Sequence, residues 1–144
     1  MDDVVVHSRE QDVKRHLENV GIYATPQRRA IAEVLFRRHQ HLTADEIYEK
    51  VARSAKGVSR ATIYNTLNLF TEKGLLREIF VDASRTFYDT NTRPHYHLYN
   101  VDTGLLVDIE DPAVNRYFSR ELPDGVKLEG IDIVIRVRNS KTGS

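Results

Sequence analysis

The sequence predicts an α+β fold in which an N-terminal winged helix-turn-helix domain, residues 1–88, precedes a small α/β domain, residues 89–144. Three observations support this fold class. Apolar residues recur at helical spacing as far as Gly74, which predicts four helices. Two short strand-like segments follow and predict a β-hairpin. Beyond a Pro-containing segment at about 89–94, which predicts a hinge, β-branched residues again indicate strands.

Composition excludes several classes of protein. The 144 residues include 21 basic and 21 acidic side chains and no cysteine, which excludes disulfides, thiolate zinc sites and cysteine nucleophiles. No apolar run is long enough to span a membrane and the polar N-terminus does not resemble a signal peptide, so we expect a soluble, cytoplasmic protein without a membrane partner. Between Val13 and Arg77, twelve basic residues accompany six acidic ones, and this net charge of +6 favours a polyanionic partner.

The first three helices have recognisable boundaries. The first is expected at residues 8–20, from the spacing of its apolar residues. The second begins at the TPQRR segment, because Thr25 can cap a helix whose first position is Pro26. For the third, Thr43 and Glu46 match a capping box.

The fourth helix is expected between Ser59, whose hydroxyl can cap the first turn, and Gly74, which suits the left-handed residue after a helix. Its apolar stripe faces a core. The opposite face carries hydrogen-bonding groups and an aromatic ring but no acidic residue, which is typical of a helix that enters a phosphate-lined groove. An ordinary amphipathic surface helix is the alternative. The stripe comprises Ile63, Leu67 and Phe70, and the opposite face Ala61, Tyr64, Asn65 and Asn68.

Three helices followed by a candidate recognition helix predict a helix-turn-helix. Two strands joined at Asp82–Ser84 would then form a hairpin behind that helix, which completes a winged helix. Arg77 and Arg85 of the hairpin are either phosphate contacts or ordinary solvated side chains.

The second half of the chain is expected to be small and strand-rich. Two strands should flank Asp102–Gly104, a short helix should occupy 112–122, and a β-branched final strand should lie within 127–138. The apolar face of these strands is long for so few residues, so we expect a second copy of the chain to cover it. The second half would therefore be a dimerisation domain.

His95 and His97 are candidate metal ligands, because alternate residues of a strand point to the same face. Asp89 and Asp108 could complete a site of nitrogen and oxygen ligands, which favours iron(II) or manganese(II) as the metal, with zinc as a further metal in vitro. His41, expected at the start of the third helix, could join the two domains through the same metal. Surface and capping histidines are the alternative interpretation.

The motifs TPQRR, HLTADEIY, SRATIYNTLNLFTEKGLL, FYDTN and HYHLY, in this order, resemble the Fur family of metal-responsive repressors. The resemblance covers nearly the whole chain after Val13 and implies a homodimer on an AT-rich inverted repeat of double-stranded DNA. It implies an inter-domain metal site at His41, Asp89, His95, His97 and Asp108. With this resemblance, we expect the DNA-binding residues to be Tyr23, Thr25, Arg28, Arg29, Ser59, Arg60, Ala61, Thr62, Tyr64 and Asn65.

The chain also departs from most of that family. Asn100 and Thr103 stand where one of two cysteine pairs holds a structural zinc, and the second pair is missing. Pro94 and Tyr96 replace ligands of an additional metal site, and Tyr23 replaces a basic residue that enters the minor groove. No structural four-cysteine zinc is therefore expected.

The segments YNTLNLFTEKG and FYDTN and the ending IDIVIRVR resemble the iron response regulator subgroup, Irr, which also lacks the cysteine pairs. This resemblance implies a regulator of iron homeostasis that is active when iron is scarce and is released from DNA by haem. His95 and His97 are then the candidate haem-binding residues. The middle histidine of the subgroup's three-histidine run is Tyr96 here, and its N-terminal Cys-Pro motif is absent.

Our leading hypothesis is a dimeric transcription regulator of iron homeostasis, with neither enzymatic activity nor a small-molecule substrate. A peroxide sensor of the PerR type, or a metal-corepressed Fur-type repressor, is the alternative within the same fold. An iron enzyme built on His95, His97 and Asp89 is a distant alternative, because the chain is too short to surround a substrate pocket. A winged helix that contacts proteins instead of DNA is a further one.

Overall fold

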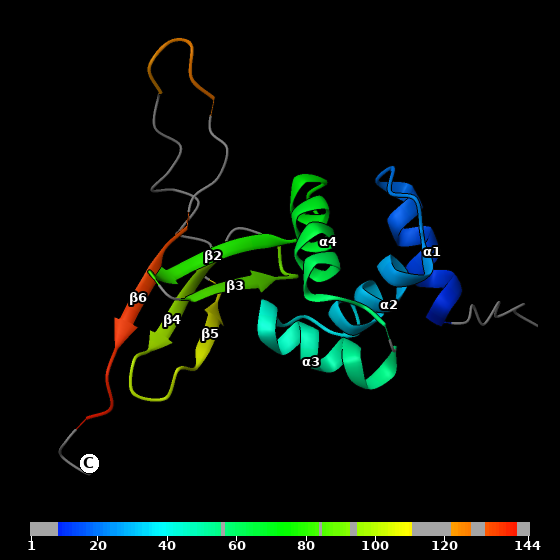
Figure 1. Ribbon diagram of the computed structural model, residues 1–144. Helices are drawn as coiled ribbons and strands as arrows, with labels where there is room; N and C mark the ends of the chain where they lie inside the picture. The colour runs from blue at the N-terminus through cyan, green and yellow to red at the C-terminus, as the bar shows by residue number, and fades with distance from the viewer. Residues whose placement is uncertain are drawn as a thin grey trace, which may run out of the picture. The chain divides into compact units, whose positions relative to one another are not determined.

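The computed structural model describes residues 9–55, 57–83, 85–92, 95–110, 122–127 and 132–140. The chain forms two compact units, Met1–Thr92 and Arg93–Ser144. The helices are α1 (Arg9–Asn19), α2 (Pro26–Leu35), α3 (Ala44–Ser54) and α4 (Arg60–Glu72), as Figure 1 shows. The strands are β1 (His41–Thr43), β2 (Arg77–Asp82), β3 (Arg85–Asp89), β4 (Tyr96–Asn100), β5 (Leu106–Ile109) and β6 (Val134–Val137).

Side-chain caps begin three of the helices, as the sequence predicts. Thr25 Oγ1 accepts a hydrogen bond from the Arg28 amide at 3.2 Å at the start of α2. Thr43 and Glu46 form the complete capping box of α3. At α4, Ser59 Oγ accepts from the Thr62 amide at 3.1 Å. These bonds satisfy amides that have no partner within the helix, so each helix starts at a defined residue.

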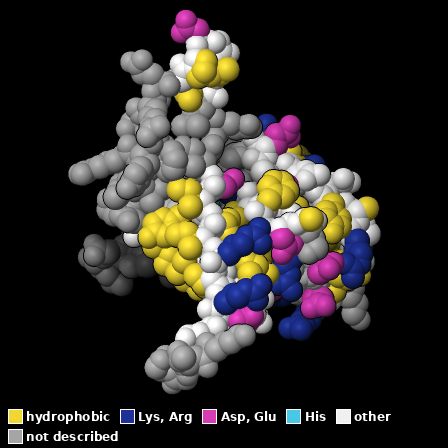
Figure 2. Space-filling view, turned by 90° about the vertical axis from the view of Figure 1, so that its left-hand side faces the viewer, with side chains coloured by type: hydrophobic (Ala, Val, Ile, Leu, Met, Phe, Trp, Pro, Cys, Tyr) yellow, Lys and Arg dark blue, Asp and Glu magenta, His cyan; other side chains and the backbone are white. Residues whose placement is uncertain are grey.

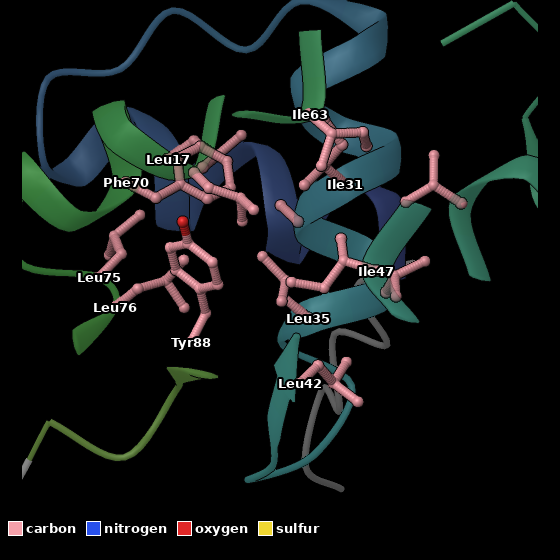
Figure 3. Packing of buried hydrophobic residues seen from close by; sticks show 14 of the residues in the cluster. Leu17, Ile31, Leu35, Leu42, Ile47, Ile63, Phe70, Leu75, Leu76 and Tyr88 are labelled. Atoms are coloured by element: carbon pink, nitrogen blue, oxygen red, sulfur yellow. The ribbon is translucent and has the colours of Figure 1, made fainter. Parts of the chain in front are cut away.

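The helices of the first unit enclose one apolar core (Figure 3). The predicted stripe of α4 lies inside it, with Ile63 at 1% exposure and Leu67 and Phe70 at 0%. Tyr88 of β3 also packs in this cluster, so the hairpin shares the core of the helices. Burying each large apolar side chain contributes about 2 kcal/mol, which makes α4 a fixed part of the unit.

The first sheet has the strand order β1-β3-β2, with both pairs antiparallel. Together with α2, α3 and α4 it forms the predicted winged helix. The sequence pattern predicts His41 at the start of a helix and gives no sign of β1. In the structure His41 lies on β1 and pairs with Asp89. A strand of three residues is too short to show an alternating pattern in the sequence. The first unit accordingly continues beyond residue 88, the predicted domain end.

The second sheet has the order β5-β4-β6, in which β4 pairs antiparallel with β5 and parallel with β6. The two strands predicted around the 102–104 turn are therefore confirmed. The final strand, predicted within 127–138, covers only Val134–Val137 of the described residues. The helix predicted at 112–122 lies outside the described residues apart from its last position, as do the last two residues, 93 and 94, of the predicted hinge.

A polar network, here called the Asn100 clasp, joins the β4–β5 turn to the residues after β6. Asn100 Oδ1 accepts hydrogen bonds from the amides of Asp102 and Thr103, at 2.9 and 3.2 Å. Asn100 Nδ2 donates to Asn139 Oδ1 at 2.8 Å, and the Asn139 amide donates to Asp102 Oδ2 at 2.8 Å. Hydrogen bonds thus hold together the two chain segments that border this end of the sheet.

Among the described helices, none combines the length and the apolar character needed to cross a lipid bilayer.

Candidate metal centre and nucleic-acid interface

Two histidines lie side by side in the second unit. His97 is on β4 and His95 directly precedes that strand, so the two side chains point to the same face. Their ring centroids are 4.4 Å apart, and only 2% of His95 and 1% of His97 is exposed. Histidines on a solvated surface, the alternative interpretation, would be exposed. A buried pair of imidazoles instead needs a specific polar partner.

Asp108 supplies that partner from the neighbouring strand. It stands opposite His97 in the β4–β5 register, and its Oδ1 lies 3.3 Å from His97 Nε2 and 3.4 Å from His95 Nε2. A direct charged hydrogen bond would be shorter, at about 2.8 Å. Two ligand atoms that share a tetrahedral first-row metal, each about 2.1 Å from it, stand roughly 3.4 Å apart. The spacing of the three side chains therefore fits a shared metal ion.

The other two predicted ligands belong to the first unit. His41 on β1 and Asp89 on β3 are directly opposite each other in an antiparallel register, which puts their side chains on one face. Asp89 is fully buried and its Oδ1 accepts a hydrogen bond from the Asn91 amide at 2.8 Å. The His41 ring meets the edge of Phe87, with centroids 6.2 Å apart. The five predicted ligands thus form one group in each unit.

The polar face of α4 is exposed, as its pattern predicts. Ala61, Asn65 and Asn68 are exposed and Tyr64 retains 46% of its surface. A recess of about 200 Å³ lies between this helix and the start of α2. It is lined by Thr25, Gln27, Arg28, Thr62, Asn65, Thr66 and Leu69.

The recess brings together predicted DNA-binding residues from two helices and adds Gln27, which the sequence analysis missed. Its position in the first turn of α2, beside the capping Thr25, was the available signal. Arg28 also donates from Nη1 to the carbonyl oxygen of Tyr23 at 3.0 Å, and Tyr23 itself is 80% exposed. The turn before α2 is thereby fixed beside an exposed aromatic side chain.

Arg60 is engaged by the preceding helix. Its Nη1 lies 2.7 Å from Asp45 Oδ1, and its guanidinium carbon is 4.2 Å from the centroid of the Tyr48 ring. The exposed face of α4 carries an acidic residue, Glu72, only in its last turn, but α3 places the carboxylate of Asp45 at its N-terminal edge. The sequence analysis did not foresee this pairing, which joins residues 15 positions apart.

Residues 19–136 match the model of the ferric uptake regulator family. The chain belongs to this family. It is 38% identical, over 77% of its length and 74% of the relative's, to the peroxide-responsive repressor PerR of Staphylococcus aureus. Its fold is similar to the ferric uptake regulator of Pseudomonas aeruginosa with manganese, at a TM-score of 0.72 and 24% identity over 89% of this chain and 98% of that one. The Campylobacter jejuni peroxide stress regulator gives 0.61 at 25% identity, over 94% and 99%.

These comparisons confirm the predicted fold class and the predicted family. Like its relatives, the chain is a metal-responsive transcription regulator and not an enzyme. The relatives at 37–38% identity are named for peroxide and not for the iron response, so the Irr subgroup stays a prediction.

Proposed function

We propose that this chain is a homodimeric DNA-binding regulator whose operator affinity is set by a divalent metal at His95, His97 and Asp108. The observation that carries the proposal is the buried ligand set of the second sheet, with nitrogen-to-oxygen distances of 3.3 and 3.4 Å. In a family of metal-responsive regulators, such a set is best explained as the sensory site.

The proposed metal is iron(II) or manganese(II), with zinc able to occupy the site in vitro. Imidazole and carboxylate ligands suit these ions, whereas the chain offers no thiolate for softer ones. His41 and Asp89, which share one face of the first sheet, are the proposed further ligands. A metal that used ligands from both units would couple its own binding to the geometry of the DNA-binding unit, which is the requirement for a switch.

The proposed dimer uses the other face of the second sheet. Leu98 pairs with Val107 on one side and Ile135 on the other, so these three residues share the face opposite His97. Val107 is 42% and Ile135 41% exposed. Figure 2 shows hydrophobic side chains gathered in one contiguous group over this sheet. A second copy that covers this face would remove it from water, at about 25 cal/mol for each Å² buried.

The proposed DNA contacts follow from the winged helix. The α4 helix of each protomer would enter a major groove of an AT-rich inverted repeat, where Asn65 can read a base edge and Tyr64 can pack on thymine methyl groups. The side chains of Arg28 and Arg29, at the start of α2, would contact phosphates. The protein would act in the cytoplasm, where its DNA is.

Two signals are compatible with this site. Similarity to peroxide-responsive repressors supports a sensor in which iron-bound histidines become oxidised. The motifs that resemble Irr support a regulator of iron homeostasis, with haem bound through His95 or His97. Mass spectrometry separates them, because a peroxide sensor loaded with iron should gain one oxygen on His41 or His95 after peroxide treatment, whereas an iron-response regulator should not.

The test of the proposed function is fluorescence anisotropy of the full chain on an AT-rich inverted-repeat duplex, with chelator, manganese(II), iron(II) or haem. We expect metal to change the affinity at least about tenfold, a coupling free energy of roughly 1.4 kcal/mol. Binding that requires manganese or iron indicates a PerR-like or Fur-type corepressed regulator. Binding by the chelated protein that haem reverses indicates an Irr-like one.

His97→Ala should abolish the metal effect, while His39→Ala, which removes an exposed histidine, should preserve it. A wild-type protein whose affinity for the duplex is the same with chelator, metal and haem would contradict the proposal.

A further inference from the structure

The first residue of the recognition helix is held by the helix before it. Arg60 opens α4, and its Nη1 lies 2.7 Å from a carboxylate oxygen of Asp45, in the first turn of α3. This is within the range of a charge-assisted hydrogen bond. The geometry therefore pairs a predicted DNA-binding cation with an anion of the same unit.

A second contact fixes the direction of the pair. Tyr48 is three positions after Asp45, so the two side chains lie on one face of α3. The Arg60 guanidinium carbon stands 4.2 Å from the Tyr48 ring centroid, which is a cation–π distance. The carboxylate and the ring together bind the guanidinium beside the N-terminus of α4.

The ion pair between Arg60 and Asp45 is open to solvent. The side chain of Arg60 is 57% exposed and that of Asp45 is 73% exposed. An ion pair this exposed contributes little to stability, about 1 kcal/mol or less, so its main consequence is electrostatic. A phosphate that approaches Arg60 meets a pair with no net charge and has a carboxylate within a few ångströms.

We propose that Asp45 is a specificity-determining residue that weakens the sequence-independent attraction of the recognition helix for DNA by neutralising Arg60. The inference rests on the proposed function. Affinity for any DNA rises with the number of phosphates that cations neutralise, whereas base readout by Asn65 and Tyr64 requires the correct sequence. A carboxylate that pairs with Arg60 lowers the affinity for DNA of any sequence and leaves base readout unchanged. It therefore increases the ratio of specific to non-specific affinity.

The opposite role would also use these contacts. Asp45 and Tyr48 could orient Arg60 towards a phosphate that it then binds with its remaining N–H groups. In that case removal of the carboxylate would weaken binding to every duplex, instead of strengthening it. The sign of the change therefore separates the two roles.

The experiment compares Asp45→Asn with Glu49→Gln in the full chain. Both substitutions remove one exposed carboxylate from α3, but only Asp45 contacts Arg60 among the contacts seen in the described residues. Anisotropy is measured on a duplex of random sequence and on the duplex that the wild type binds most tightly, over a series of salt concentrations. Circular dichroism melts confirm that both variants are folded.

We expect Asp45→Asn to bind the random duplex about threefold to tenfold more tightly, with a slope of log affinity against log salt that is steeper by about 0.9, the value for one added phosphate contact. Glu49→Gln should change the affinity less than about twofold, since it does not release Arg60. In an Arg60→Ala background, Asp45→Asn should lose most of its effect.

Weaker binding by Asp45→Asn, or an equal gain for both variants, overturns the inference and leaves the proposed function in place. A wild-type protein with no salt-dependent affinity for any duplex overturns the proposed function itself.

Discussion

The two units bury their apolar residues in different ways. The four helices of the first unit direct their apolar stripes at one another and at Tyr88, and the side-chain caps of three of them come from their own segments. In the second unit, the face of the sheet with Leu98 keeps large apolar side chains exposed, and the opposite face buries two histidines. The first unit therefore carries its own core, whereas we propose that the second also relies on a second copy of the chain and on a metal.

This difference follows from the geometry of the elements. A helix with one apolar stripe can bury that stripe against a single contact surface, and a small bundle of helices supplies such a surface. A sheet has two faces, and three short strands need other groups to cover both of them. We therefore expect the stability of the DNA-binding unit to be internal, and that of the second unit to respond to a partner and to metal.

The largest expected effect is in the helical core. Phe70→Ala removes a fully buried ring and should lower the free energy of unfolding by about 3–5 kcal/mol, through lost burial and a residual cavity. Urea unfolding followed by circular dichroism measures this. Leu105→Ala, at a position 61% exposed, should cost less than about 0.5 kcal/mol in a monomeric sample. Similar costs for both variants would contradict the claim that the first unit has the closed core.

The next effect should appear in the oligomeric state. Ile135→Glu places a carboxylate in the exposed apolar face of the second sheet, where a second copy would have to bury it without a partner. We expect sedimentation velocity to show a monomer where the wild type is a dimer. Phe80→Glu, on the hairpin at a position 67% exposed, serves as the control and should remain dimeric. A dimeric Ile135→Glu protein would place the interface elsewhere.

A third test uses the ionisation of Tyr88. Burial raises the pKa of Tyr88 to about 12 from 10.0, with smaller contributions from Glu78 and Tyr64. Because the pKa is raised in the folded state, this contribution to stability is complete below pH 10 and is lost as the pH rises towards 12. At pH 11, one unit above 10.0, the loss should be about 1.4 kcal/mol or less, because each pKa unit corresponds to about 1.4 kcal/mol and solvent screens part of it.

Urea unfolding at pH 8 and pH 11 measures that loss for the wild type and for Tyr88→Phe. The variant should have the flatter dependence on pH, whereas Tyr23→Phe, whose ring is 80% exposed, should follow the wild type. Parallel curves for all three proteins would show that Tyr88 does not link pH to the core.

The smallest expected effect concerns the Asn100 clasp. Asn100→Ala removes an acceptor for two turn amides and a donor to Asn139, and should cost about 1 kcal/mol. Hydrogen exchange should increase in β4–β6 and stay unchanged in α2–α4. Chelators should leave the clasp intact in the wild type, because its contacts are hydrogen bonds among side chains and backbone amides and involve no metal ligand. Asp124→Ala, at an exposed position, is the control.

Much of the fold could be predicted from local signals. The capping residues Thr25, Thr43 and Ser59 define helix starts because the bonds they accept come from amides three positions later. The exposed polar face of α4 follows from helical periodicity. The same-face placement of His95 and His97 follows from the two-residue period of a strand, so the arrangement of two of the five predicted ligands is a local property.

What the sequence alone determined is therefore the four helices, the caps of three of them, the hairpin and the faces that these elements present, since these depend on neighbours within about four residues. The tertiary structure decided the rest. It created β1 by pairing His41 with Asp89, set the register that brings Asp108 to His97, and placed Arg60 in an ion pair with Asp45. These partners are between 11 and 48 positions apart, and no local pattern specifies which distant segments the burial of the core will bring together.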